Sequence, residues 1–128
     1  MNTMSFDPFM LSLAEHDARM LHLQRARLEM NRLKHVAKAV HHRVRKAYYR
    51  KVGALGLTPP AVIGIEAKVQ LLLAAHPEED MEVLLTHLQL LQQRLRDAVR
   101  EASEAEVSYL LASARLGTPA LASELVIG

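Results

Sequence analysis

Apolar residues recur every three or four positions along two long stretches of the chain, a spacing that predicts amphipathic helices. The first stretch contains no glycine or proline between Pro8 and Val52, so we predict a first helix over residues 8–52. Asp7 is the expected cap of this helix and Pro8 its first residue. The apolar stripe, with His16 in its one gap, consists of Phe9, Leu13, Met20, Leu23, Ala26, Met30, Leu33, Ala37, Val40, Val44, Tyr48 and Val52.

The second long stretch alternates spacings of three and four without a slip, which is typical of a coiled coil. We predict a helix over residues 77–116 that begins at Pro77 and ends before Gly117 and Pro119, followed by a loose tail over residues 117–128. Its apolar stripe consists of Met81, Leu84, Leu88, Leu91, Leu95, Ala98, Ala102, Ala105, Tyr109, Ala112 and Leu116.

Gly53, Gly56 and the prolines at 59 and 60 predict a connector between these helices. A short helix over residues 59–75 is expected to follow, with apolar residues on most of its faces. The predicted fold is therefore all-α: one helical domain over residues 1–128, with two long antiparallel helices as a coiled-coil-like hairpin and a short apolar helix between them. One short helix cannot cover both long stripes, so we expect an oligomer or a larger complex.

The composition narrows the classes of function. Half of the residues are hydrophobic and only 4% are aromatic, which favours helices built from Leu, Ala, Val and Met. Cysteine is absent, so disulfides, thiolate metal sites and thiol nucleophiles are excluded. Neither a signal peptide nor an apolar run of about 18 residues is visible, so we expect a cytoplasmic protein that is not inserted in a membrane.

Positive charge is concentrated in the first predicted helix. Eleven of the sixteen Lys and Arg residues lie between Arg19 and Lys51, together with one acid, Glu29, so this stretch carries +10. The remaining residues carry five bases and thirteen acids, or −8. Because like charges repel along a helix, something is expected to neutralise this surface.

Three neutralising partners stay open at the level of the sequence. The third predicted helix carries −5 from Pro77 to Glu106 and would act within the fold. A nucleic-acid backbone would bind through phosphate contacts. An acidic protein or an anionic membrane surface is the third candidate. The predicted nucleic-acid-binding residues are Arg25, Arg27, Arg32, Lys34, Lys38, Arg43, Arg45, Lys46 and Arg50.

Contacts to the backbone, rather than to bases, are the expected mode of nucleic-acid binding. The sequence lacks a helix-turn-helix pattern, zinc-finger spacing and RNP-type aromatics. RNA and DNA, and single and double strands, are therefore not distinguished. Tyr48 and Tyr49 lie among the bases, and we expect Tyr48 in the apolar stripe and Tyr49 beside it; the alternative is that one of them stacks on a base.

The seven histidines do not predict a metal site. No two stand three or four apart with a third ligand nearby, so we expect no metal and no cofactor. Histidines among the bases would instead add positive charge as the pH falls toward about 6.

Catalytic patterns are also missing, since there is no Gly-rich phosphate loop and no nucleophile elbow. The leading hypothesis is a non-catalytic helical subunit that contacts a nucleic-acid backbone within a larger nucleoprotein assembly. The alternative is a helical adaptor, chaperone or structural component of a protein complex, for example a secretion apparatus. Its predicted interface residues are Met81, Leu84, Leu88, Leu91 and Leu95.

Overall fold

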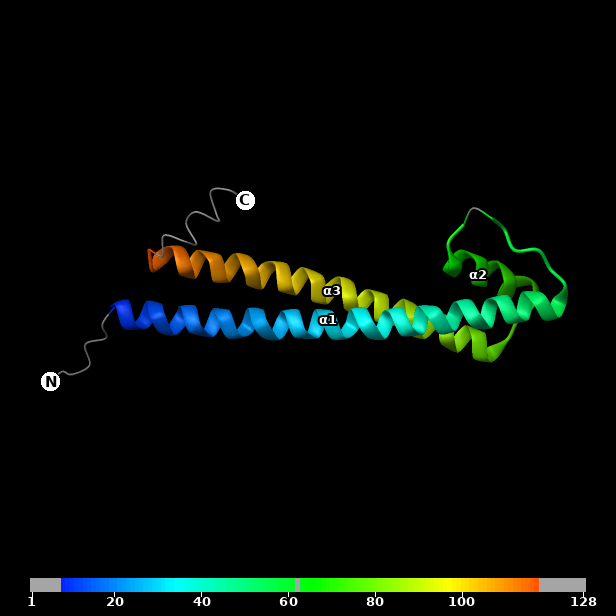
Figure 1. Cartoon of the computed structure of the whole chain (residues 1–128), viewed down its shortest axis with the longest axis horizontal. Coiled ribbons are helices and arrows are strands. Elements are labelled where there is room, and N and C mark those ends of the chain that lie inside the picture. Colours follow the sequence, from blue (N-terminus) through cyan, green and yellow to red (C-terminus); the bar gives the residue numbers. More distant parts are fainter. Residues whose placement is uncertain (1–7, 62, 118–128) are drawn as a thin grey trace. The chain divides into compact units, whose positions relative to one another are not determined.

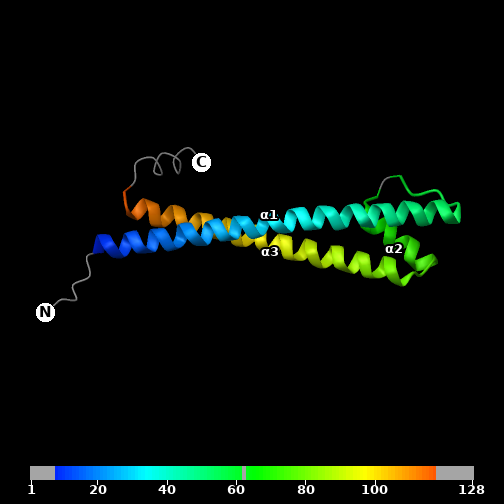
Figure 2. The same cartoon turned by 60° about the horizontal axis from the view of Figure 1, so that its bottom comes forward.

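The chain folds into three helices and, within residues 8–61 and 63–117, no strands. These two ranges are the part of the chain that the computed structural model describes. Helix α1 spans Pro8–Leu55, α2 spans Ile65–Ala75 and α3 spans Glu79–Arg115. Figures 1 and 2 show the two long helices lying side by side, with the short one between them in the chain, so the predicted all-α fold is confirmed. The predicted cap Asp7 and the predicted tail from Thr118 onward lie outside the described residues.

The residues group into two compact units, which are described separately. Of the described residues, the first unit combines 8–31 with 97–117, and the second comprises those from 32 to 96. Each unit therefore takes one part of α1 and one part of α3.

In the first unit the two long helices run antiparallel. Glu15 of α1 pairs with Arg115 of α3 at 3.1 Å, and Arg27, further along α1, pairs with Glu106, earlier in α3, at 3.7 Å. The core residues between the helices are Leu23, Ala26, Ala102 and Ala105, with Met30 and Tyr109 packed against them. Because three of the four core side chains are Ala, the helix backbones can approach closely.

The second unit has a larger core, to which all three helices contribute. Val44 of α1, Val69 of α2 and Leu88 of α3 are completely buried. The spacing of buried residues on α1 changes here to four at each step, from Val40 through Val44 and Tyr48 to Val52. Four residues exceed one helical turn by about 40°, so the buried stripe rotates around α1, and α1 can contact α2 as well as α3.

Helix α1 is three residues longer than predicted, because Gly53 does not end it. The helix ends one turn later at Gly56, whose φ of 66° lies in the left-handed region that glycine tolerates. Gly56 N–H donates to Gly53 C=O and Leu57 N–H donates to Val52 C=O, which together form a Schellman motif.

Helix α2 begins at Ile65, six residues later than the predicted start at Pro59. Gly64 is its N-cap, with an extended backbone (φ −68°, ψ 166°), and Gly64 C=O accepts the bond from Lys68 N–H. A glycine inside a helix costs about 1 kcal/mol relative to alanine, so the helix starts after Gly64 rather than running through it. Not all of its apolar faces are buried, since Leu71 is 58% exposed.

The predicted break between the second and third helices is present, because residues 76–78 are not helical. Helix α3 begins two residues after Pro77, and Glu78 C=O accepts the bond from Glu82 N–H. Its end before Gly117 agrees with the prediction, and Gly117 has a left-handed φ of 70°. In the first turns of α3 the fully buried leucine is Leu85, while the predicted Leu84 is partly exposed.

Candidate functional site

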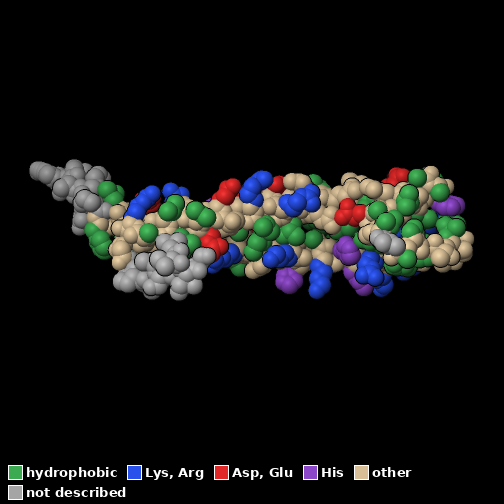
Figure 3. Space-filling model, turned by 90° about the horizontal axis from the view of Figure 1, so that it is seen from above, with side chains coloured by type: hydrophobic (Ala, Val, Ile, Leu, Met, Phe, Trp, Pro, Cys, Tyr) green, Lys and Arg blue, Asp and Glu red, His purple; other side chains and the backbone are tan. Residues whose placement is uncertain are grey.

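The exposed side of α1 between residues 32 and 50 is almost entirely basic. Of its eleven exposed residues, nine are Lys, Arg or His, and the other two are Ala39 and Tyr49. We call these nine residues the basic face: Arg32, Lys34, His35, Lys38, His42, Arg43, Arg45, Lys46 and Arg50. Figure 3 shows Lys, Arg and His side chains projecting next to one another along one edge of the visible surface.

All nine Lys and Arg residues predicted to bind nucleic acid are exposed. Seven of them lie on the basic face within the second unit, where one continuous helix fixes their spacing. The remaining two, Arg25 and Arg27, belong to the first unit.

Ion pairs with acids distant in the sequence are found at both ends of the basic stretch. At one end Arg27 pairs with Glu106 at 3.7 Å, and at the other Lys51 pairs with Glu78 at 3.4 Å. Within the described residues, no carboxylate oxygen lies within 4.0 Å of the side-chain nitrogens of Lys34, Lys38, Arg43, Arg45, Lys46 or Arg50.

The sequence of α3 explains this gap. Between Glu82 and Asp97 the helix contains no acid, and its two charged residues there, Arg94 and Arg96, are basic. The third helix, one of the three neutralising partners left open by the sequence, therefore supplies no ion pair to these six side chains within the described residues.

The two units consequently differ in the sign of their charge. Residues 32–96 contain eleven Lys and Arg and five Asp and Glu, which gives +6. Residues 1–31 and 97–128 contain five Lys and Arg and nine Asp and Glu, which gives −4. Five of the seven histidines also belong to the positive unit.

Tyr49 lies beside the residues of the basic face and contacts Lys68 and Tyr48. Its hydroxyl accepts a hydrogen bond from Lys68 Nζ at 3.3 Å, and the same nitrogen is 5.7 Å from the ring centroid. The ring also makes an edge contact with Tyr48, with centroids 5.1 Å apart. Tyr48 is buried, as predicted, whereas Tyr49 remains 42% exposed. Sequence reasoning missed Lys68, since nothing in the pattern places α2 beside Tyr49.

A shallow hollow of about 600 Å³ opens next to Tyr49. Its lining residues are His42, Arg45, Lys46, Tyr49 and Arg50, so three permanent positive charges surround one aromatic ring. This combination suits a phosphate beside a planar base.

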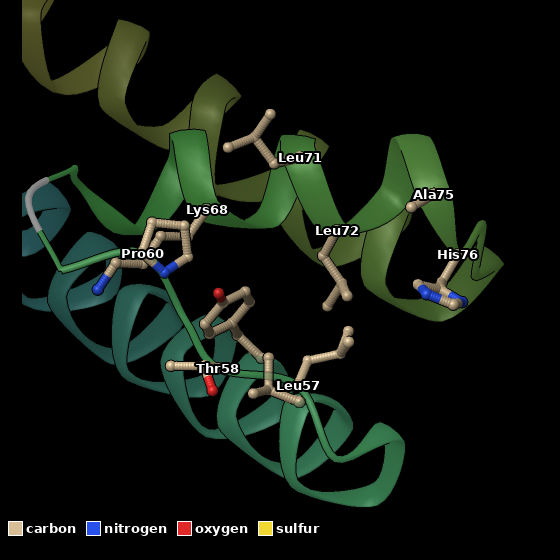
Figure 4. A pocket seen from close by; sticks show the side chains of 10 residues that line it. Leu57, Thr58, Pro60, Lys68, Leu71, Leu72, Ala75 and His76 are labelled. Atoms are coloured by element: carbon tan, nitrogen blue, oxygen red, sulfur yellow. The ribbon is translucent and has the colours of Figure 1, made fainter.

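A second hollow in this unit is apolar and lies between the end of α1, the connector and α2. It has a volume of about 240 Å³, and Figure 4 shows Leu57, Leu72 and Pro60 around it, with Lys68 and His76 contributing polar groups. Pockets that hold small-molecule ligands measure about 300–1,000 Å³, so this one falls below the usual range.

The residues predicted as a protein interface lie on the helix face that packs inside the chain. Met81, Leu88 and Leu91 are buried, and Leu84 and Leu95 are partly buried. Packing within the chain accounts for their burial, so they give no argument for a second protein.

Neither a metal site nor a membrane-spanning helix is found in the described ranges. No three His, Asp or Glu side chains there come together as metal ligands. No helix there is long and apolar enough to cross a membrane.

The described residues thus define a class of protein: an all-α helical hairpin that carries a densely basic exposed helix face. Comparison of the chain with protein-family models, curated proteins and solved structures finds no match in any of the three. The function is therefore inferred from the geometry and charge of the site.

Proposed function

We propose that this protein is a non-catalytic helical subunit that binds the phosphate backbone of a nucleic acid through the basic face of α1, within a larger nucleoprotein assembly. The observation that carries the proposal is the set of six exposed Lys and Arg side chains from Lys34 to Arg50 for which the described residues offer no carboxylate within 4.0 Å. A partner with regularly spaced negative charges would relieve their mutual repulsion.

The spacing of the charges supports a polyphosphate partner. Seven Lys and Arg residues lie between Arg32 and Arg50, a distance of about 27 Å along a helix that rises ~1.5 Å per residue. One nucleic-acid strand carries a phosphate every ~3.4 Å, or about eight over the same length. The two linear charge densities therefore match closely.

The angular spread of the basic face favours a partner that surrounds the helix. At about 100° per residue, the basic face covers about 180° of the helix circumference, from Lys34 around to Arg43. A flat anionic membrane would reach only one side of such a helix. A duplex major groove is ~12 Å wide and has phosphates on both walls, and a helix with its side chains is ~10–12 Å across.

The chemistry of these side chains supports binding that does not depend on base sequence. Lys and Arg contacts to phosphates fix position and carry no sequence information. Tyr49 offers a single exposed ring for stacking, which tolerates any base.

The test is the binding of fluorescent 30-nucleotide single strands and 30-base-pair duplexes, measured by anisotropy over a salt series. If all seven charges contact phosphates, log K should fall against log salt with a slope of about −6 for a duplex and about −5 for a single strand. RNA and DNA versions of both probes would identify the preferred nucleic acid.

The variant Lys34→Glu/Lys38→Glu/Arg45→Glu should weaken binding by roughly a hundredfold or more and lower the slope by about three. Arg27 is left unchanged because Glu106 already pairs with it. The matched control is Arg94→Glu/Arg96→Glu/Arg100→Glu, which makes the same change in net charge on exposed positions of α3. Equal losses in both variants, or binding that does not respond to salt, would contradict the proposal, provided that circular dichroism shows intact helices.

A second candidate function, a helical adaptor of a protein complex, is favoured by apolar side chains that protrude from both long helices, such as Leu28 (70% exposed) and Val83 (61%). In that case none of the nucleic-acid probes would bind at low salt. The basic face would then serve an acidic protein.

A further inference from the structure

Helix α1 carries a second apolar stripe in the first unit, on the side away from α3. We call Ala14, Leu21 and Leu28 the outer stripe; they stand seven residues apart and all are exposed, Leu21 by 45% and Leu28 by 70%. Leu21 and Leu28 are each two residues from a core residue, Leu23 and Ala26 respectively. Two residues correspond to about 200° around a helix, so the outer stripe points away from the core.

The residues around the outer stripe are arranged symmetrically about Leu21. Asp17 precedes Leu21 by four residues and Arg25 follows it by four, while Ala14 and Leu28 are seven residues away on either side. In an antiparallel pair of identical helices centred on Leu21, Asp17 of each copy therefore meets Arg25 of the other. The small Ala14 likewise meets the large Leu28, which fills the space beside it.

The charged groups in this arrangement are available for such contacts. No carboxylate of a described residue lies within 4.0 Å of the Arg25 guanidinium. Asp17 has 64% of its side chain exposed, and its contact is with the neighbouring His16, at 3.5 Å. A parallel pair would instead place Asp17 against Asp17 and Arg25 against Arg25, so charge complementarity selects the antiparallel orientation.

We propose that the outer stripe binds a second copy of this chain, with the two α1 helices antiparallel and Leu21 on the twofold axis. The same patch serves both partners, as an isologous dimer requires. Two apolar contacts between Leu28 and Ala14, one between the Leu21 side chains and two Asp17–Arg25 pairs make up the interface. This proposal does not depend on nucleic-acid binding.

Cross-linking of single-cysteine variants tests the orientation directly, because the chain has no cysteine of its own. Leu21→Cys should cross-link to itself with a short bis-maleimide. Ala14→Cys alone and Leu28→Cys alone should not, whereas a mixture of the two should. Self-linking of Ala14→Cys as efficient as that of Leu21→Cys would overturn the antiparallel arrangement.

Charge variants test the partner contacts by sedimentation equilibrium. Asp17→Arg places two Arg residues in contact and Arg25→Asp places two Asp residues in contact, so each variant alone should dimerise at least tenfold more weakly than the wild type. A mixture of the two variants restores both opposite-charge pairs and should form a heterodimer of wild-type affinity. Both substituted positions are exposed, so circular dichroism should remain unchanged.

A monomeric wild type at protein concentrations of about 100 μM, a range in which specific dimers of modest affinity associate, would overturn the proposal. So would single charge variants that dimerise as well as the wild type, or a mixture that does not regain the affinity.

Discussion

Two glycines three residues apart on α1 have opposite roles. Gly56 has a φ of 66° and closes the helix, whereas Gly53 lies within it. A Cβ atom added at either position would meet no atom within 4 Å, so only the backbone conformation distinguishes them.

Gly56→Ala should destabilise the protein by about 1 kcal/mol, because an L side chain is strained at this positive φ. Gly53→Ala should instead stabilise it by about 0.5–1 kcal/mol, because alanine costs less conformational entropy in a helix. Urea denaturation followed by circular dichroism measures both changes. Equal effects of the same sign at the two sites would show that the Schellman end of α1 does not form in solution.

The exposure of the basic side chains is the residue-level feature that the sequence predicted best. Once the apolar stripe of α1 is assigned, helix geometry places Lys34, Lys38 and Arg45 outside it. The partners of individual side chains were not predictable in the same way. Arg27 meets Glu106 and Lys51 meets Glu78 because the register between α1 and α3 brings them together.

At the level of the elements, one face of α3 holds the second unit together. Leu88 is completely buried, while Leu90, two residues later, is 49% exposed. Because the two residues are identical in type and differ in burial, truncating each one separates the contribution of packing to stability from that of residue type.

Leu88→Ala should lower the free energy of unfolding by about 2–5 kcal/mol, because a buried leucine leaves a cavity when it is truncated. Leu90→Ala should cost less than about 1 kcal/mol, because its side chain is half-exposed. The measurement is urea unfolding at two protein concentrations. A loss at Leu88 that depends on concentration would mean that this leucine packs between chains rather than inside one.

The long helices could be predicted because each predicted range has an apolar period sustained over many turns and no glycine or proline after its first residue. The short helix was predicted less well. Its apolar residues suggested a start at Pro59, but Gly64 takes an extended conformation and the helix begins at Ile65. A local start signal is weak when the residues after it lack core contacts, and Ile63 is 37% exposed.

For the molecule as a whole, the division of charge between its two units is the main physical feature. The unit that contains the basic face carries +6, and its Lys and Arg residues include like-charged neighbours one helical turn apart, such as Lys34–Lys38 and Lys46–Arg50. Each such pair on a helix costs about 0.2–0.5 kcal/mol at low salt.

Raising the sodium chloride concentration from 50 to 500 mM should therefore stabilise the free protein by about 1 kcal/mol, because salt screens this repulsion. Urea unfolding at the two salt concentrations measures the change. The variant Lys34→Glu/Lys38→Glu/Arg45→Glu should lose most of this stabilisation. A free protein that salt destabilises would indicate that exposed ion pairs such as Arg27–Glu106 outweigh the repulsion.

The sequence by itself determined the helical class, the two long helices, the buried stripes and the basic exposed side of α1. These follow from local period and local charge, which act over one or two helical turns. Only the tertiary structure decided that Lys51 pairs with Glu78 and that Lys68 of α2 donates a hydrogen bond to Tyr49. These contacts depend on the register between helices distant in the chain, which no local pattern encodes.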